Sequence, residues 1–193
     1  MKLKILFLIL FTTGCATADI AVDKAAMKSV KTIAIAPFTT SVDLPRNILS
    51  EAEGNFRSAL IKLQYKVVER EKLNTILKEK ELAMTGITAE NAKSVGVMLG
   101  ADAILLGEVL SYNESQREVE DFETKVKEIK TFYKFQIIVR LVDVSTGSII
   151  LTVKNASPEV MQVKELSGYS SLDSYRILVL NQMETDLVNA IKK

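Results

Sequence analysis

The sequence predicts an α/β domain with a mixed β-sheet, in the order β-α-β-α-α-β, followed by an antiparallel β-hairpin and a C-terminal helix. Three patterns carry this prediction. Apolar runs at 31–37 and 103–110 are typical of strands that are covered on both faces. Apolar residues at helical spacing dominate the segment between them. Residues 133–142 largely alternate between apolar and polar side chains, which indicates a strand with one buried face.

The first half of the chain predicts a β-helix-β unit and then two further helices. Apolar residues recur at helical spacing across 45–63, before a short strand at 65–69, which implies a right-handed parallel crossover. The next helices are expected at 70–83 and 88–99. Gly100 is suited to end the second of them, because glycine adopts the left-handed conformation without strain.

The second half predicts antiparallel strands and a terminal helix. Residues 133–142 and 148–153 form the two strands, and Gly147 supplies the positive φ that the short turn between them needs. Apolar residues recur at helical spacing across 172–191, which predicts the C-terminal helix.

The composition excludes several functional classes. The chain has 193 residues, typical of one domain with appendages, and 48% of them are hydrophobic. With 25 basic and 24 acidic side chains the net charge is +1, so no bulk field favours nucleic acid. The chain has no histidine and one cysteine, which excludes Ser-His and Cys-His pairs and histidine-ligated metals. We therefore expect no enzyme activity, no catalytic residue, no metal and no cofactor.

Residues 1–14 predict a signal peptide. Lys2 and Lys4 form a basic start, and an unbroken apolar run of seven residues follows from Ile5 to Phe11. About 20 apolar residues are needed to span a bilayer, so this run has the length of a signal-peptide core. The alternative is a buried N-terminal helix or strand, but the run has no amphipathic period.

The residues around Cys15 resemble a bacterial lipobox, the site where a lipoprotein precursor is lipidated and cut. Small or modest side chains lead into the cysteine, although a lipobox usually has leucine where this chain has Thr12. The resemblance implies a diacylglycerol group on the Cys15 sulfur, cleavage after Gly14, and an acyl chain such as palmitate on the new amine. The alternative, ordinary secretory cleavage, would leave an unpaired thiol in an oxidising compartment.

A lipidated Cys15 would hold the protein on a membrane without spanning it, because two or more acyl chains anchor stably. The mature chain would lose two lysines, which leaves 23 basic and 24 acidic side chains and a net charge of −1. Ala16 stands where aspartate would signal inner-membrane retention in the enterobacterial sorting rule. We therefore expect the periplasmic face of the outer membrane of a Gram-negative bacterium, with 15–29 as the lipidated tether and 30–193 as the folded domain.

Four segments, in this order, resemble the family of curli production assembly/transport lipoproteins (CsgG-like). They are VKTIAIAPF at 30–38, YKVVEREKLNTILKEKEL at 65–82, LGADAILLGEVLSYN at 99–113 and FQIIVRLVDVSTGSIILTV at 135–153. The resemblance implies a periplasmic α/β domain that hangs from the outer membrane by Cys15. It also implies a non-enzymatic role in envelope assembly or secretion, through contacts with envelope proteins or with further copies of the chain.

The segment 113–130 departs from the family's channel-forming members, which carry a membrane-crossing hairpin here and another after the fifth strand. Ten of its eighteen residues are charged, and a Lys or Arg facing lipid at the bilayer midplane costs about 2–4 kcal/mol. The second position offers only 155–170 before the terminal helix. We therefore expect a member that lacks the transmembrane hairpins and is not itself a pore.

Two structures are compatible with 113–130. Its apolar residues are spaced three and four apart, which favours an amphipathic helix, or a stiff excursion, whose apolar stripe contacts the domain or a partner. The residues of this candidate partner-contact stripe are Val119, Phe122, Val126 and Ile129. The alternative is a solvated, charged β-hairpin.

Other functional interpretations remain open beside envelope assembly. One is a lipoprotein activator of a peptidoglycan synthase, a role that similar domains perform. Another is a small-ligand binder, since such sites leave no sequence signature. A carboxylate-based hydrolase that uses the acidic cluster at 118–123 is disfavoured, because these carboxylates lie in a highly charged, solvated stretch.

Overall fold

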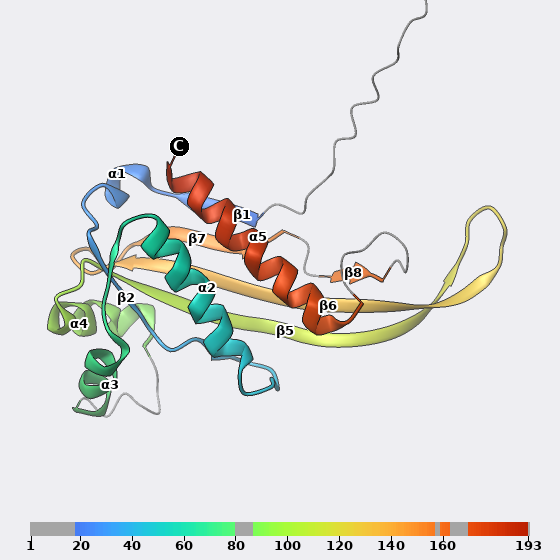
Figure 1. The fold of residues 1–193 in the computed structure, drawn as a ribbon, viewed down its shortest axis with the longest axis horizontal. Helices are drawn as coiled ribbons and strands as arrows, with labels where there is room; N and C mark the ends of the chain where they lie inside the picture. The colour runs from blue at the N-terminus through green and yellow to red at the C-terminus, as the bar shows by residue number, and fades with distance from the viewer. Residues whose placement is uncertain (1–17, 80–86, 157–158, 163–169, 193) are drawn as a thin grey trace, which may run out of the picture.

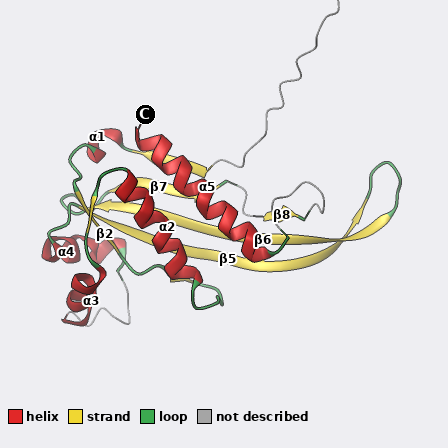
Figure 2. Cartoon of the chain, in the orientation of Figure 1, coloured by secondary structure: helices red, strands yellow, loops and turns green. Residues whose placement is uncertain are grey.

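The structure is a computed structural model of the chain, and it describes residues 18–79, 87–156, 159–162 and 170–192. A mixed sheet forms the centre, and a long two-stranded projection leaves it at one side (Figure 1, Figure 2). The described strands pair in the order β1-β7-β6-β5-β2-β4, with β3 beside β5 and β8 beside β6. The strands are β1 (Ala18–Val22), β2 (Thr32–Ile35), β3 (Thr39–Thr40), β4 (Lys66–Val67), β5 (Ala103–Glu120), β6 (Lys127–Asp143), β7 (Ile149–Asn155) and β8 (Glu159–Met161). The helices are α1 (Lys24–Met27), α2 (Ile48–Lys62), α3 (Arg70–Glu79), α4 (Ala89–Leu99) and α5 (Leu172–Lys192).

The parallel half of the sheet is built as the sequence predicts. β2 lies between β4 and β5 and runs parallel to both, so that α2 connects two parallel strands while α3 and α4 lead to a third. β5, β6 and β7 then follow as antiparallel neighbours, and α5 closes the chain. The predicted α/β class, the order of elements and the mixed sheet are confirmed.

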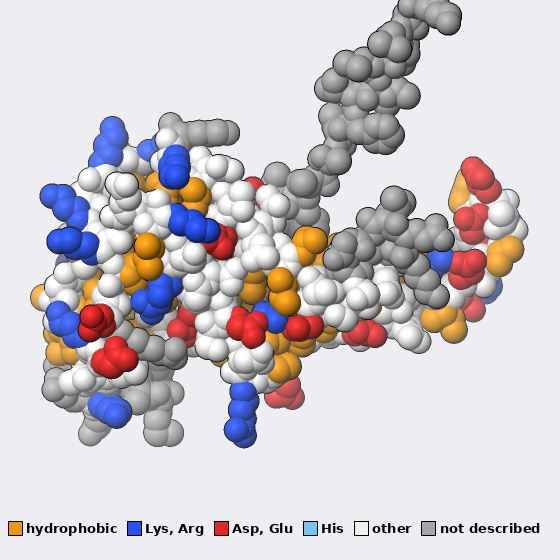
Figure 3. All heavy atoms as spheres, in the orientation of Figure 1, with side chains coloured by type: hydrophobic (Ala, Val, Ile, Leu, Met, Phe, Trp, Pro, Cys, Tyr) orange, Lys and Arg blue, Asp and Glu red, His pale blue; other side chains and the backbone are white. Residues whose placement is uncertain are grey.

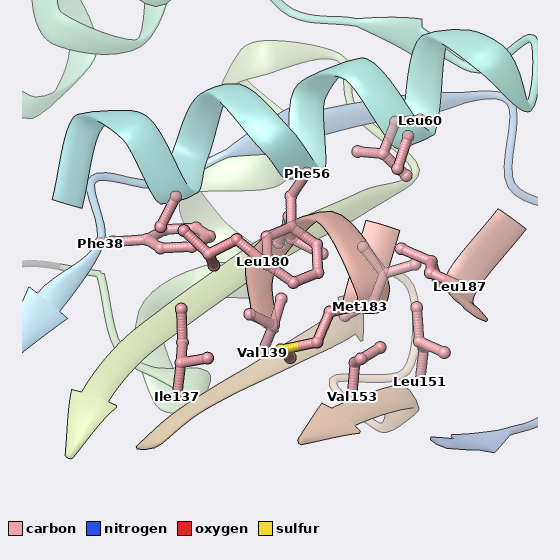
Figure 4. Close-up of a cluster of buried hydrophobic side chains, with 14 of the residues drawn as sticks. Phe38, Phe56, Leu60, Ile137, Val139, Leu151, Val153, Leu180, Met183 and Leu187 are labelled. Atoms are coloured by element: carbon pink, nitrogen blue, oxygen red, sulfur yellow. The ribbon is translucent and has the colours of Figure 1, made fainter. Parts of the chain in front are cut away.

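The main core lies where α2 and α5 pack side by side over one face of the sheet (Figure 4). Side chains from both helices point into one cluster with Val139 of β6. They include Phe56 and Leu60 of α2 and Met183 and Leu187 of α5, each at most 1% exposed. Burying a side chain of this size stabilises the fold by about 1.5–3 kcal/mol, so the packing of α2 and α5 on the sheet contributes strongly to stability.

A second, smaller core lies on the opposite face of the sheet, under α3 and α4. It contains Leu73, Leu99 and Ile104, which are almost fully buried. α4 ends as predicted, because Gly100 has a φ of +65°. Gly147 likewise has a φ of +79° in the turn between β6 and β7.

The tether predicted at 15–29 is largely part of the folded domain. β1 pairs antiparallel with β7 along its whole length, from Ala18 opposite Asn155 to Val22 opposite Leu151. Asp23 then caps α1, because its carboxylate accepts hydrogen bonds from two backbone N–H groups of the first turn. The segment pairs with the open edge of β7. Its positions alternate between half-buried and exposed, but two of its five residues are alanines, so the alternation is not visible in the sequence.

Candidate interaction surface

β5 and β6 continue past the sheet as a slender two-stranded projection. Beyond β8, which pairs with 132–134 of β6, the described residues place no third strand beside them. After a shift in register between Val109 and Ser111, the antiparallel pairing runs unbroken from Ser111 opposite Gln136 to Glu120 opposite Lys127. We call residues 113–130 the arm, and Figure 1 shows it standing well clear of the body of the domain.

The helical interpretation of 113–130 is wrong, and the alternative of a solvated β-hairpin is confirmed. β5 and β6 enter the segment already paired, so each further pair extends an existing ladder, whereas a helix would need a costly new nucleus. The segment is also flanked by β-branched and aromatic residues, which favour strands. A hairpin is therefore present at the first of the two positions, and it is the charged one that the sequence left open as the alternative.

Asp121 organises the turn at the tip of the arm. Its Oδ1 accepts hydrogen bonds from the backbone N–H and the hydroxyl of Thr124, at 2.8 and 2.9 Å, and a longer one from the Glu123 N–H. The bonds from Thr124, chiefly, hold the pKa of Asp121 below its ordinary value. Lys125 follows in the left-handed conformation, with a φ of +58°, and its N–H donates to the Asp121 carbonyl at 3.0 Å.

The same turn closes the hairpin between β6 and β7. There Asp143 accepts from the N–H and hydroxyl of Thr146, and Gly147 takes the left-handed position. The sequences DFETK at 121–125 and DVSTG at 143–147 thus share an aspartate, a threonine three residues later and a left-handed residue after it. This internal match is the signal by which the arm could have been recognised from sequence.

Charged side chains line both faces of the arm, and several form ion pairs with one another. Lys127 Nζ lies 2.8 Å from Glu118 Oε1, and Lys130 pairs with Glu128. Near the base, Arg117 bonds Glu159 of β8 at 2.7 Å and stacks over the Phe132 ring at 3.7 Å. Exposed ion pairs contribute at most about 1 kcal/mol each, so they keep the arm soluble more than they stiffen it.

Apolar side chains stand exposed among these charges near the tip (Figure 3). Phe122 is 86% exposed, Ile129 72% and Val126 53%. Lys125 Nζ lies 5.0 Å from the centre of the Phe122 ring, which is otherwise largely open to solvent. Large apolar side chains grouped on a projection in this way are typical of a contact surface.

The four residues of the predicted stripe do not share one face. Val119 is opposite Glu128 in the ladder and Ile129 is opposite Glu118, so the two apolar side chains lie on opposite faces of the hairpin. Phe122 and Val126 lie in and beside the turn. The structure therefore brings three of the four, Phe122, Val126 and Ile129, to the exposed end of the arm. We call these three the tip residues.

A buried cation that the sequence analysis did not predict lies near Tyr112, the residue that precedes the arm. The guanidinium of Arg176, on α5, lies 2.7 Å from Asp173 and 2.6 Å from Glu51 of α2, and the residue is 1% exposed. Burial raises the pKa of nearby Tyr112 on β5, and the charge of Asp173 adds to this. A groove of about 280 Å³ opens beside Arg176 between α2 and α5, but its cation is already engaged.

Within 18–79, 87–156, 159–162 and 170–192, no three carboxylate, thiol or imidazole groups are placed to hold a metal ion. The same ranges contain no helix with the length and apolar character needed to cross a membrane. The predicted signal peptide at 1–14 and the predicted lipidation site, Cys15, lie outside the described residues.

Comparisons with known proteins show which family this chain resembles. The family model described as curli production assembly/transport component CsgG matches residues 23–170. No curated protein matches the sequence significantly.

Several solved structures are similar to this chain. Lipoprotein GNA1162 from Neisseria meningitidis has a TM-score of 0.50 and 15% identity, over 80% of this chain and 99% of that one. The PelC dodecamer from Paraburkholderia phytofirmans has a TM-score of 0.49 and 13% identity, over 89% and 96%. The LpoB C-terminal domain from Escherichia coli has a TM-score of 0.46 and 18% identity, over 68% and 83%.

Proposed function

This chain belongs to the CsgG family of curli production assembly/transport components, and from that premise we propose a function for it. It is a periplasmic lipoprotein, anchored in the outer membrane through Cys15, with a non-enzymatic role in envelope assembly or secretion. It acts through protein contacts, and the arm is its principal contact element. The observation that carries this proposal is the exposure of the tip residues on a charged hairpin that the body does not cover.

Two features support a contact role over catalysis. The acidic residues at 118–123 belong to ion pairs and to the turn, where the carboxylate of Asp121 is held ionised by its hydrogen bonds. Asp121 is therefore not suited to act as a general acid near neutral pH. The tip residues, in contrast, offer a partner apolar area surrounded by charges of both signs, the arrangement of a contact core with a polar rim.

The lipid anchor is tested by Cys15→Ser in the full-length protein. We expect the variant to remain unprocessed at Gly14 and to lack the lipid. After extraction at high salt, the wild-type protein should stay in the membrane fraction. Residues 16–193 secreted behind a cleavable signal peptide, and so without lipid, should be released by the same extraction. If this domain also resists extraction, another anchor holds it and this part of the proposal is wrong.

The contact role is tested by photocrosslinking in the native cell. A photoreactive amino acid at Phe122 should give one discrete crosslinked band, whose partner is identified by mass spectrometry. The matched control is Ile61 of α2, which is 58% exposed but lies on the body. Equal crosslinking from Ile61, or no band from Phe122 and Val126, would contradict the proposal.

A further inference from the structure

The folded domain begins only three residues after Cys15. β1 starts at Ala18, whose N–H donates a 2.8 Å hydrogen bond to the carboxylate of Asp186 on α5. An extended chain spans at most about 3.3–3.6 Å per residue, so three residues reach no farther than about 11 Å. A membrane that holds Cys15 must therefore lie close to the point where β1 meets α5.

The outer surface of α5 beside this point carries no charge on its exposed positions. Between its first and last turns these positions are Ile177, Leu178, Asn181, Thr185 and Asn189, which we call the α5 stripe. Exposed positions of α2, in contrast, include the charged Glu51 and Lys62. The outer face of a surface helix is normally charged or strongly polar, so the α5 stripe is unusual for a face in water.

The acidic residues of α5 in this region, Glu184 and Asp186, are engaged in an ion pair and in hydrogen bonds. Glu184 pairs with Lys62 of α2 at 2.6 Å and its side chain is 14% exposed. Asp186 accepts bonds from Ala18 and from Gln182. The stripe therefore presents two apolar side chains, Ile177 at 45% and Leu178 at 42% exposed, beside neutral amide and hydroxyl groups.

The stripe and the start of β1 adjoin each other. Ala18 and Leu178 line the same small cavity of about 30 Å³, together with Gln182. Figure 1 shows the start of β1 beside α5, on the side of the molecule that the two helices cover. The attachment point and the uncharged surface thus belong to one region of the domain.

We propose that the α5 stripe lies against the phospholipid headgroups of the membrane that holds Cys15. The inference rests on the lipid anchor of the proposed function. Apolar side chains gain free energy at the boundary of headgroups and acyl chains, which suits Ile177 and Leu178. The neutral polar side chains can hydrogen-bond to headgroups. The exposed acids nearest the stripe, Glu51 and Asp173, are both paired with Arg176, which limits repulsion from anionic lipid. The short link favours a membrane over a second protein as the occupant, because it brings the membrane to this surface in every copy.

The test uses full-length, lipidated protein in vesicles of phosphatidylethanolamine and phosphatidylglycerol. Cys15 is the only cysteine in the chain, so an introduced cysteine is the only free thiol once the Cys15 sulfur carries lipid. Leu178→Cys and the control Val97→Cys are labelled with a polarity-sensitive dye. Val97 is 66% exposed on α4, which packs on the opposite face of the sheet.

Lipids that carry a nitroxide on the headgroup should quench the dye at Leu178 several-fold more than the dye at Val97. A long Gly-Ser insertion between Ala16 and Thr17 should bring the quenching at Leu178 down to the level at Val97. Equal quenching at the two sites, or quenching that the insertion leaves unchanged, would overturn the inference. A dye at Leu178 that is shielded from water but not quenched would also overturn it, because a protein then covers the stripe.

Flotation of the same samples separates this inference from the proposed function. Protein that floats with the vesicles but shows equal quenching refutes only the membrane contact of α5. Protein that does not float refutes the lipid anchor and, with it, this inference.

Discussion

Arg176 shows how single side chains hold the separate elements of this domain together. Burial alone lowers the pKa of its guanidinium, but hydrogen bonds and charges from Asp173 and Glu51 outweigh this and raise it above the ordinary value. The cation therefore remains charged while buried, and it ties α2 to the first turn of α5 at the base of the arm. Removing one partner of such a buried pair is costly, because the remaining charge loses its compensation.

Leu105 tests the assignment of β5 to the centre of the sheet. Leu105 is fully buried between β2 and β6. Leu105→Asp should unfold the domain, because burying an unpaired carboxylate costs several kcal/mol, against a total stability of about 5–15 kcal/mol. The matched control is Ile129→Asp on the exposed arm, which should melt like the wild type in a circular dichroism scan. A cooperatively folded Leu105→Asp variant would show that the strand is not central.

Asp143 should make the stability of the domain depend on pH. Hydrogen bonds from the Ser145 hydroxyl and then from Thr146 outweigh burial and hold its pKa below the ordinary value. The stabilisation is therefore complete above the pKa of an unfolded aspartate, about 4, and is lost as the pH falls through the lower folded value. Asp143→Asn should destabilise the domain by about 1–2 kcal/mol near neutral pH, and by progressively less below about pH 4.

Urea unfolding at a series of pH values measures this difference. Asp121→Asn is the matched control, since Asp121 closes the same kind of turn at the tip of the arm. Its effect on global unfolding should be small, because the arm tip touches no core. If the difference in free energy of unfolding between the wild type and Asp143→Asn grows as the pH falls, the assigned role of Asp143 is wrong.

At the scale of elements, the arm should be separable from the domain. Replacing 117–130 by Asn-Gly joins Gln116 to Thr131, which already face each other in the ladder, through a two-residue turn that suits a hairpin. The removed side chains bury no core residue, so the melting temperature should stay close to that of the wild type. The crosslink from the arm should disappear, and the partner should no longer co-purify. A shortened protein that fails to fold would show that the arm is structural.

The elements also show how far sequence alone reaches. Helices with apolar residues at helical spacing, observed at 48–62 and 172–192, were predictable from periodicity, and the strand predicted at 103–110 was predictable from its apolar run. β1 was not predicted, because its short sequence does not by itself indicate a strand and the strand forms by pairing with the open edge of β7. The arm was misread because the spacing of Val119, Phe122, Val126 and Ile129 fits a helix as well as a hairpin, and only the register inherited from the sheet decides between them.

The arm, as the candidate contact site, was predictable only in part. Its position and charge follow from the sequence, and three of the four stripe residues are exposed at the tip. The contact of Arg176 with Glu51 was not predictable, since the two residues are far apart in the chain and neither carries a local signal of burial. The periodicity of a sequence shows which face of a single helix or strand is buried. A contact such as Arg176 with Glu51 depends on how two helices pack against each other.

At the scale of the whole molecule, the proposed anchor, the body and the arm have separate roles. Under the proposed lipid anchor, the short link from Cys15 to β1 brings the body to the membrane, and the arm projects from the body (Figure 1). Such a division suits a protein that positions a partner beside the membrane. It also limits what the arm can do inside the bilayer, because both of its faces carry charge.

We therefore predict that the protein alone does not conduct ions. One face of the arm carries Arg117, Glu128 and Lys130, and the other carries Glu118, Glu120 and Lys127. Neither face can turn to lipid, since each Lys or Arg at the midplane costs about 2–4 kcal/mol. Mature, lipidated protein in a planar bilayer should give no unitary currents, with a known channel-forming family member as the positive control. Stable currents that vanish in the variant lacking 117–130 would show that the arm enters the membrane and that the scaffold interpretation is wrong.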